Sequence, residues 1–274
     1  MRTVLTLVPL QDTPQPVSHH HIQSALYHIL AYQGHTEVHN QSNSEQKQYR
    51  YFCFSNIYPF TPNEPFKKDT KVQLTVSSPE ERYIDAITSF ARAKPTILLG
   101  RYPFIITQAK TIRTRVGDQV TLRTATPIVV NIPRKRFQEY GIEEHKKNHT
   151  YWQSSIPLNA FVDLMSRNMV LKYNKYYGAS LSEQMVIIKK FVLLSEKPAF
   201  VPFKGGKIIG NHWKFTIDVP NDLYRRIVSF AIDCGFGEKN SAGFGFMNMV
   251  SPTRSRTAFP GYKQNSPISS PMAP

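Results

Sequence analysis

The spacing of apolar residues marks some segments as strands and others as helices. These segments follow one another in the same order in both halves of the chain, and this repeated order constrains the fold most strongly. Residues 2–10 alternate as a strand does, and the apolar residues after Ser18 recur at helical spacing. Strand-like residues 50–58 and 71–78 come next, followed by a helical segment with Ile84 and by further strand-like residues. The first half therefore predicts the order β-α-β-β-α-β, which is the ferredoxin-like arrangement.

The second half repeats this order without sequence identity to the first. Its expected elements are a strand in 119–133, a helix in 155–177, a strand pair in 189–203 and 212–220, and a last helix and strand in 221–250. We therefore predict an α+β fold of two tandem ferredoxin-like (RRM-like) domains with a glycine-rich loop near the C-terminal end. The predicted bounds are residues 1–116 and 117–250, followed by a disordered Ser- and Pro-rich tail, 251–274.

Residues that favour helix ends lie at the expected boundaries. Ser78 and Glu81, with Pro79 between them, have the spacing of a capping box. Asn221 is placed to open the last helix, and Gly235 to close it.

The charge of the chain predicts a polyanionic partner. The 274 residues include 34 Lys and Arg against 19 Asp and Glu, a formal net charge of +15. Each phosphate that a basic protein neutralises releases condensed counterions, so nucleic acid is favoured over an anionic membrane surface or a merely solvated basic surface.

The sequence lacks the signals of membrane proteins, secreted proteins and metal-binding proteins. We expect no membrane span, because no apolar run reaches about 18 residues, and a cytoplasmic location, because the start is too short for a signal peptide. Cys53 and Cys234 are far apart, without metal-ligand spacing, and are expected to be buried free thiols. The aspartates are scattered singly, so we predict no metal and no cofactor.

Four glycines lie close together in "CGFGEKNSAGFGF", Cys234 to Phe246. The order helix–glycines–strand excludes a dinucleotide fingerprint, in which the glycines follow a strand and open a helix. Two interpretations remain open. The glycines, with Lys239, form a cradle of exposed N–H groups for a phosphate, or they cap a helix and shape a bulged strand.

The same segment resembles the glycine-rich signature of the RAMP superfamily, and more narrowly the CRISPR repeat-processing endoribonucleases of the Cas-six (Cas6) family. "ALYHIL", "VHN", "FCFSNIY" and "VPFKGGKIIGNHWKFTI" agree with such proteins. The resemblance implies that the loop contacts RNA. The loop residues expected to do so are Gly235, Gly237, Lys239, Asn240, Ser241, Gly243 and Gly245.

RNA can be cleaved without a metal when a base activates the 2′-hydroxyl, an acid protonates the leaving oxygen, and a cation stabilises the phosphorane. The resemblance assigns the acid/base role to a histidine after the first helix, where His39 matches best and His35 is the reserve. It adds Tyr27 and Lys47 as helpers. The alternatives are a surface histidine, a core tyrosine and a solvated lysine.

Runs of basic residues supply further candidates for RNA contact. Arg113 and Arg115 lie in one run, and Arg134 and Arg136 lie in another, with aromatic residues between them that can stack on unpaired bases. Such runs are also typical of solvated faces.

The sequence thus predicts a metal-independent endoribonuclease that cleaves CRISPR repeat RNA. The alternative is a non-catalytic RNA-binding subunit of a CRISPR effector complex. The histidine in the loop after the first helix favours the enzyme. In either case we expect CRISPR RNA as the partner, with other effector-complex subunits as further partners.

Overall fold

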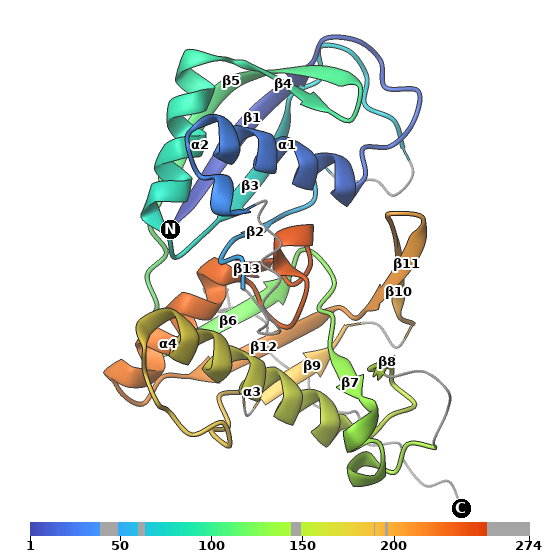
Figure 1. The fold of residues 1–274 in the computed structure, drawn as a ribbon, viewed down its shortest axis with the longest axis vertical. Helices are drawn as coiled ribbons and strands as arrows, with labels where there is room; N and C mark the ends of the chain where they lie inside the picture. Colours follow the sequence, from blue (N-terminus) through green and yellow to red (C-terminus); the bar gives the residue numbers. More distant parts are fainter. Residues whose placement is uncertain (39–48, 60–63, 144–148, 189, 195–196, 251–274) are drawn as a thin grey trace, which may run out of the picture.

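The computed structural model describes residues 1–38, 49–59, 64–143, 149–188, 190–194 and 197–250. Figure 1 shows two units, one above the other, each with helices packed on a sheet. His39, Lys47 and the predicted tail lie outside the described residues.

The first unit contains a five-stranded sheet in the order β2-β3-β1-β5-β4. Its elements are β1 (Arg2–Pro9), α1 (His19–Tyr32), β2 (Cys53–Phe54), β3 (Val72–Ser77), α2 (Glu81–Ala93), β4 (Thr96–Leu99) and β5 (Tyr102–Ile112). The strands β5, β1, β3 and β2 give the ferredoxin-like order 4-1-3-2, and β4 is an added edge strand. Apolar residues of α1 and α2 pack on one face of this sheet.

The second unit contains a four-stranded sheet in the same relative order, β13-β6-β12-β9. Its main elements are β6 (Gln119–Thr124), α3 (Leu158–Tyr177), β9 (Lys190–Leu193), β12 (Trp213–Asp218), α4 (Asp222–Cys234) and β13 (Met247–Met249). Two antiparallel hairpins are inserted, β7 (Asn131–Pro133) with β8 (His149–Tyr151) and β10 (Ala199–Phe203) with β11 (Gly206–Gly210). The predicted fold class, two tandem ferredoxin-like units, is therefore confirmed, whereas the boundary near residue 117 stays a prediction.

Most predicted helix ends agree with the structure. The side chain of Ser18 accepts a hydrogen bond from the N–H of His21, and that of Asn221 accepts one from the N–H of Tyr224. The capping box at Ser78 was wrong: α2 begins at Glu81 with Glu80 as its N-cap, and the Ser78 hydroxyl accepts from the N–H of Glu80 instead.

One predicted strand pair is divided differently. β9 pairs with β12, as expected, but residues 199–203 leave the sheet and pair with residues 206–210. The turn between β10 and β11 contains Lys204 at φ 49° and Gly205 at φ 76°, which suits a tight hairpin.

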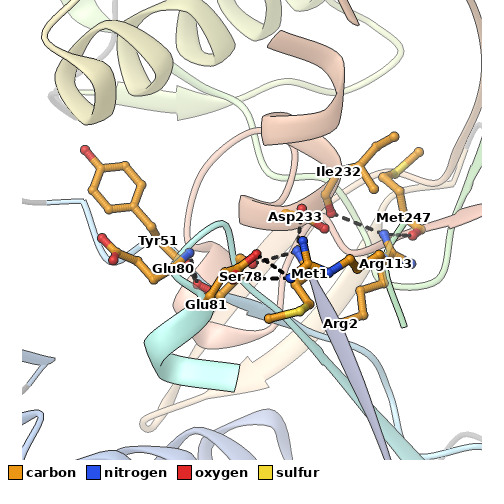
Figure 2. A network of polar contacts seen from close by, with 10 residues as sticks. All are labelled: Met1, Arg2, Tyr51, Ser78, Glu80, Glu81, Arg113, Ile232, Asp233 and Met247. Carbon is orange, nitrogen blue, oxygen red and sulfur yellow. Dashed lines mark hydrogen bonds and ion pairs between the residues drawn. The ribbon is translucent and has the colours of Figure 1, made fainter. Parts of the chain in front are cut away.

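Two residues at the start of the chain hold the two units together (Figure 2). The terminal ammonium of Met1 donates to the Ser78 carbonyl and pairs with Asp233 of α4. The buried Arg2 guanidinium donates to the carbonyls of Ile232 and Met247, at 3.2 and 2.7 Å. Burial raises the pKa of Asp233, and the nearby ammonium and Arg2 oppose that rise. These contacts fix α4 against β1 and β3.

Within the described ranges, each helix is too short or too polar to cross a bilayer.

Candidate functional site

The glycine loop (residues 235–246) connects α4 to β13 and lies against the first unit. All four of its glycines are buried, with φ between 67° and 92°. A Cβ on Gly243 would lie 2.3 Å from a ring carbon of Phe54, and one on Gly245 would lie 1.9 Å from the Phe236 carbonyl oxygen. Close packing therefore explains why these positions are glycines.

The N–H groups of these glycines are largely used within the protein. Gly235, Gly243 and Gly245 donate to the carbonyls of Ala231, Asn240 and Pro127. This pattern favours the cap-and-bulge interpretation over an open phosphate cradle. Contact of the glycines and Asn240 with RNA stays a prediction, and the loop residues that reach the surface are Lys239 and, partly, Ser241 and Glu238.

A fully buried cation supports the loop from below. The Lys172 ammonium of α3 donates to the carbonyls of Gly235 and Gly237, at 2.7 and 3.1 Å, and to the Asn240 side-chain oxygen at 2.9 Å. The Asn240 amide in turn donates to the carbonyls of Phe236 and Phe244. Burial lowers the pKa of Lys172, and the neighbouring thiols Cys234 and Cys53 oppose this shift. The sequence around Lys172 predicts a helix, but it does not indicate which groups the ammonium contacts.

Tyr27 of α1 meets the tip of this loop. Its hydroxyl lies 3.4 Å from the Ser241 hydroxyl, and Gln23 donates to the Ser241 carbonyl at 2.9 Å. The Tyr27 ring packs edge-on against Phe52, and the Arg50 guanidinium lies 5.5 Å from its centre. The structure therefore brings Tyr27 and Ser241 together, and it adds Arg50, which sequence reasoning missed.

A hollow of about 120 Å³ opens beside this contact. The residues that line it include Tyr49, Arg50, Tyr51, Asn168, Lys239 and Ser241. Lys172 and Glu238 also line it, so it combines three cations, one carboxylate, hydroxyl groups and the two tyrosine rings of the first unit. This set suits a phosphate with an adjoining base.

His19, at the start of α1, also faces the junction of the units. It is buried against Phe54 and Phe244, and its Nε2 lies 2.7 Å from the Asn56 side-chain oxygen. Burial lowers the pKa of His19, and the Asn56 contact opposes this shift. His19 is therefore part of the packed junction and is not a solvated residue of the helix start.

The reserve histidine lies elsewhere. His35 packs edge-on against Tyr83 of α2, and its Nδ1 is 3.5 Å from a carboxylate oxygen of Glu37. Its described contacts are thus to α2 and its own loop, not to Tyr27 or the glycine loop.

Three of the four predicted arginines are exposed, and Arg136 is half-buried. Arg113 pairs with Glu81 at 3.1 Å, and Arg136 pairs with Glu139. Arg115 and Arg134 are exposed. RNA contact by these four residues stays a prediction. Among the described residues, no group of three or more His, Cys, Asp or Glu side chains is arranged to hold a metal ion.

Comparisons with known proteins agree with this architecture. The family model "CRISPR associated protein Cas6, C-terminal" matches residues 107–249, which is more than half of the 274 residues. The chain therefore belongs to the Cas6 family.

Similar proteins extend the match to about nine-tenths of the chain. A CRISPR-associated endoribonuclease Cas6 of Methanocaldococcus jannaschii is 26% identical over 91% of this chain and 100% of that protein. One from Haloferax mediterranei is 24% identical over 93% and 95%. A solved structure described as "An RAMP protein binding different RNA substrates" aligns with a TM-score of 0.68 at 22% identity, covering 92% of this chain and 100% of that one.

Proposed function

We propose that this protein is an endoribonuclease that cleaves CRISPR repeat RNA within the hollow beside Tyr27. The observation that carries the proposal is the meeting of Tyr27 and Arg50 from the first unit with Lys239 and Ser241 from the second. The names of the similar archaeal proteins support an endoribonuclease of this type.

The residue types favour a metal-independent reaction. Attack by the 2′-hydroxyl on the adjacent phosphate requires a base, an acid and positive charge near the phosphorane. In our proposal His39 moves the protons, Tyr27 orients the phosphate, and Arg50 or Lys239 stabilises its charge, with Lys47 as a further cation. The products are a 2′,3′-cyclic phosphate and a 5′-hydroxyl.

The second candidate is a non-catalytic subunit that holds RNA within a CRISPR effector complex. It uses the same fold and surface but needs no proton transfer. The basic charge of +15 suits either function. The presence of His39 is the observation that makes us prefer the enzyme.

The reaction is tested with repeat RNA in EDTA. We expect cleavage to persist, with the end groups given above. One 2′-deoxy nucleotide just upstream of the cut should abolish cleavage while binding continues, because it removes the attacking oxygen alone. Cleavage of the deoxy RNA at the normal rate would exclude this chemistry.

The assignment of the histidine is tested by His39→Ala, with His35→Ala as the matched control. We expect His39→Ala to lose at least about 100-fold in cleavage rate and to keep RNA affinity within a few-fold. We expect His35→Ala to retain activity, because its described contacts are with Glu37 and Tyr83. The reverse result would transfer the role to His35.

A further inference from the structure

Two cations lie directly opposite each other on the open face of the second sheet. Arg123 of β6 is the register partner of Lys214 of β12, and both side chains are exposed. The neighbouring residues of both strands, Leu122 and Phe215, are buried on the other face, beneath α3 and α4. Like charges at directly opposed positions of an antiparallel pair destabilise a sheet. An exposed central pair of this kind therefore suggests a bound anion.

The described part of the chain supplies no carboxylate for either cation. The ion pairs of the described residues join other basic groups to acids, such as Arg113 to Glu81 and Arg225 to Asp118. Along the same row, Arg123 has Asn248 as its partner on β13, and Lys214 has Val192 on β9. The row across the sheet thus contains two cations, one amide and one apolar side chain.

On the two central strands, the adjacent row contains two hydroxyl side chains. Thr121 and Thr216 face each other with their hydroxyl oxygens 3.3 Å apart. Hydroxyl and amide groups beside cations are suitable partners for phosphate oxygens. The positive potential also acts on His212, whose pKa is lowered by burial and further lowered by Arg123.

The first sheet has no such row on its central strands. There β1 and β3 pair Val4 with Thr75 and Thr6 with Gln73, which are all neutral. On β5 a single cation, Lys110, faces Val4, so no two cations are opposed on these strands. The basic row is therefore a property of the second unit, not of the fold.

We infer that the open face of the second sheet, at Arg123, Lys214 and Asn248, binds the phosphate backbone of single-stranded RNA. The four-stranded sheets of RRM units bind unpaired RNA, with aromatic side chains that stack on the bases. Because the described residues of this row include no aromatic ring, the contact reads phosphates and is independent of base sequence. This inference rests on the proposed function only in that the substrate is RNA.

The test measures how RNA affinity depends on salt. The probe is a fluorescein-labelled 20-nucleotide oligouridylate, titrated with the full chain at several KCl concentrations. We expect the double variant R123Q/K214Q to bind about tenfold more weakly and to lower the slope of log K against log salt by about 1.4, since each lost phosphate contact in a single strand accounts for about 0.7.

The matched control is R92Q/K175Q. It removes the same two charges from exposed positions on the helical sides of the two units. We expect its slope to stay close to that of the wild type. The conservative variant R123K should also keep the slope, because the cation remains. Melting of R123Q/K214Q should occur at or above the wild-type temperature, because the repulsion between the two cations is removed.

Two results would overturn the inference: an unchanged slope in R123Q/K214Q, or an equal loss in R92Q/K175Q. The outcome is distinct from that of the cleavage assay. Wild-type protein that fails to cleave repeat RNA but shows the slope change refutes the nuclease and keeps this binding face. Protein that cleaves normally with no slope change refutes the face alone.

Discussion

The two units differ in how the chain connects their second helix to the last strand of the ferredoxin-like order. In the first unit, the chain runs from α2 through β4 and a turn at Gly100 into β5, at the exposed edge of the sheet. In the second, it runs from α4 through the buried glycine loop into β13. The same step in the topology thus forms a surface hairpin in one unit and a packed junction in the other.

The difference shows how a shared fold acquires a site. The glycine loop contacts β2 and α1 of the first unit, whereas the β4–β5 hairpin contacts its own sheet and the two helices of its own unit, α1 and α2. Of these two connections, it is the loop that brings polar side chains of one unit to those of the other, as in the contact of Tyr27 with Ser241. The site therefore depends on the junction between the units.

The largest expected effect compares one glycine from each connection. Gly243 and Gly100 both have positive φ, at 86° and 68°. A Cβ at 243 would meet the buried Phe54 ring at 2.3 Å, whereas one at 100 would meet the His21 ring at 3.1 Å. We expect Gly243→Ala to cost about 3 kcal/mol and Gly100→Ala about 1 kcal/mol. Thermal melting of the two variants measures this difference.

Gly243→Asp tests the same site against the phosphate-cradle interpretation. Packing predicts loss of folding, seen by circular dichroism, whereas a cradle predicts a folded protein that binds RNA poorly. Equal melting temperatures for Gly243→Ala and Gly100→Ala would contradict the packing argument.

The sequence predicts those features of the fold that depend on neighbouring residues, namely helix ends and the order of the elements. Ser18, Asn221 and Gly235 mark helix ends because a cap depends on a few adjacent residues. It also predicts the order of the elements, because burial on one face sets the apolar period.

The sequence does not separate the two interpretations of the glycine loop, because the deciding partner, Phe54, lies almost 190 residues away. Lys172 and His19 were missed for the same reason: their burial depends on contacts from distant segments. The hairpin at 199–210 was missed because its apolar strands resemble sheet strands.

A smaller effect is expected from the cation beneath the junction loop. Lys172→Met removes one donor from three acceptors, two of them loop carbonyls, while it relieves the cost of burying a charge. We expect a net loss of about 2 kcal/mol in the free energy of unfolding, and slower RNA cleavage because Lys239 and Ser241 lose their support.

The control is Lys175→Met, on the same helix but exposed, which should change stability by less than about 0.5 kcal/mol. Chemical denaturation of both variants gives the comparison. If Lys172→Met is as stable and active as the control, the loop does not depend on the buried ammonium.

The smallest expected effect concerns His19 and His21 of α1. One lies against the glycine loop and the other against the β4–β5 hairpin. His19 packs against Phe244 of the glycine loop, and His21 lies beside Gly100 of the hairpin. Burial lowers the pKa of each below its ordinary value of 6.5, and His19 is the more deeply buried. As the pH falls below this value, the unfolded chain takes up protons that the folded chain does not, so stability is lost.

We therefore expect wild-type protein to lose stability between about pH 7 and pH 5, and His19→Gln to lose less of it. His21→Gln should reduce this loss by a smaller amount, because its ring is less buried. Other histidines, including His212, are present in all three proteins and cancel in the comparison. Urea denaturation across this pH range measures the effect. A larger change for His21→Gln than for His19→Gln would show that the hairpin, and not the junction loop, excludes the charged histidine more strongly.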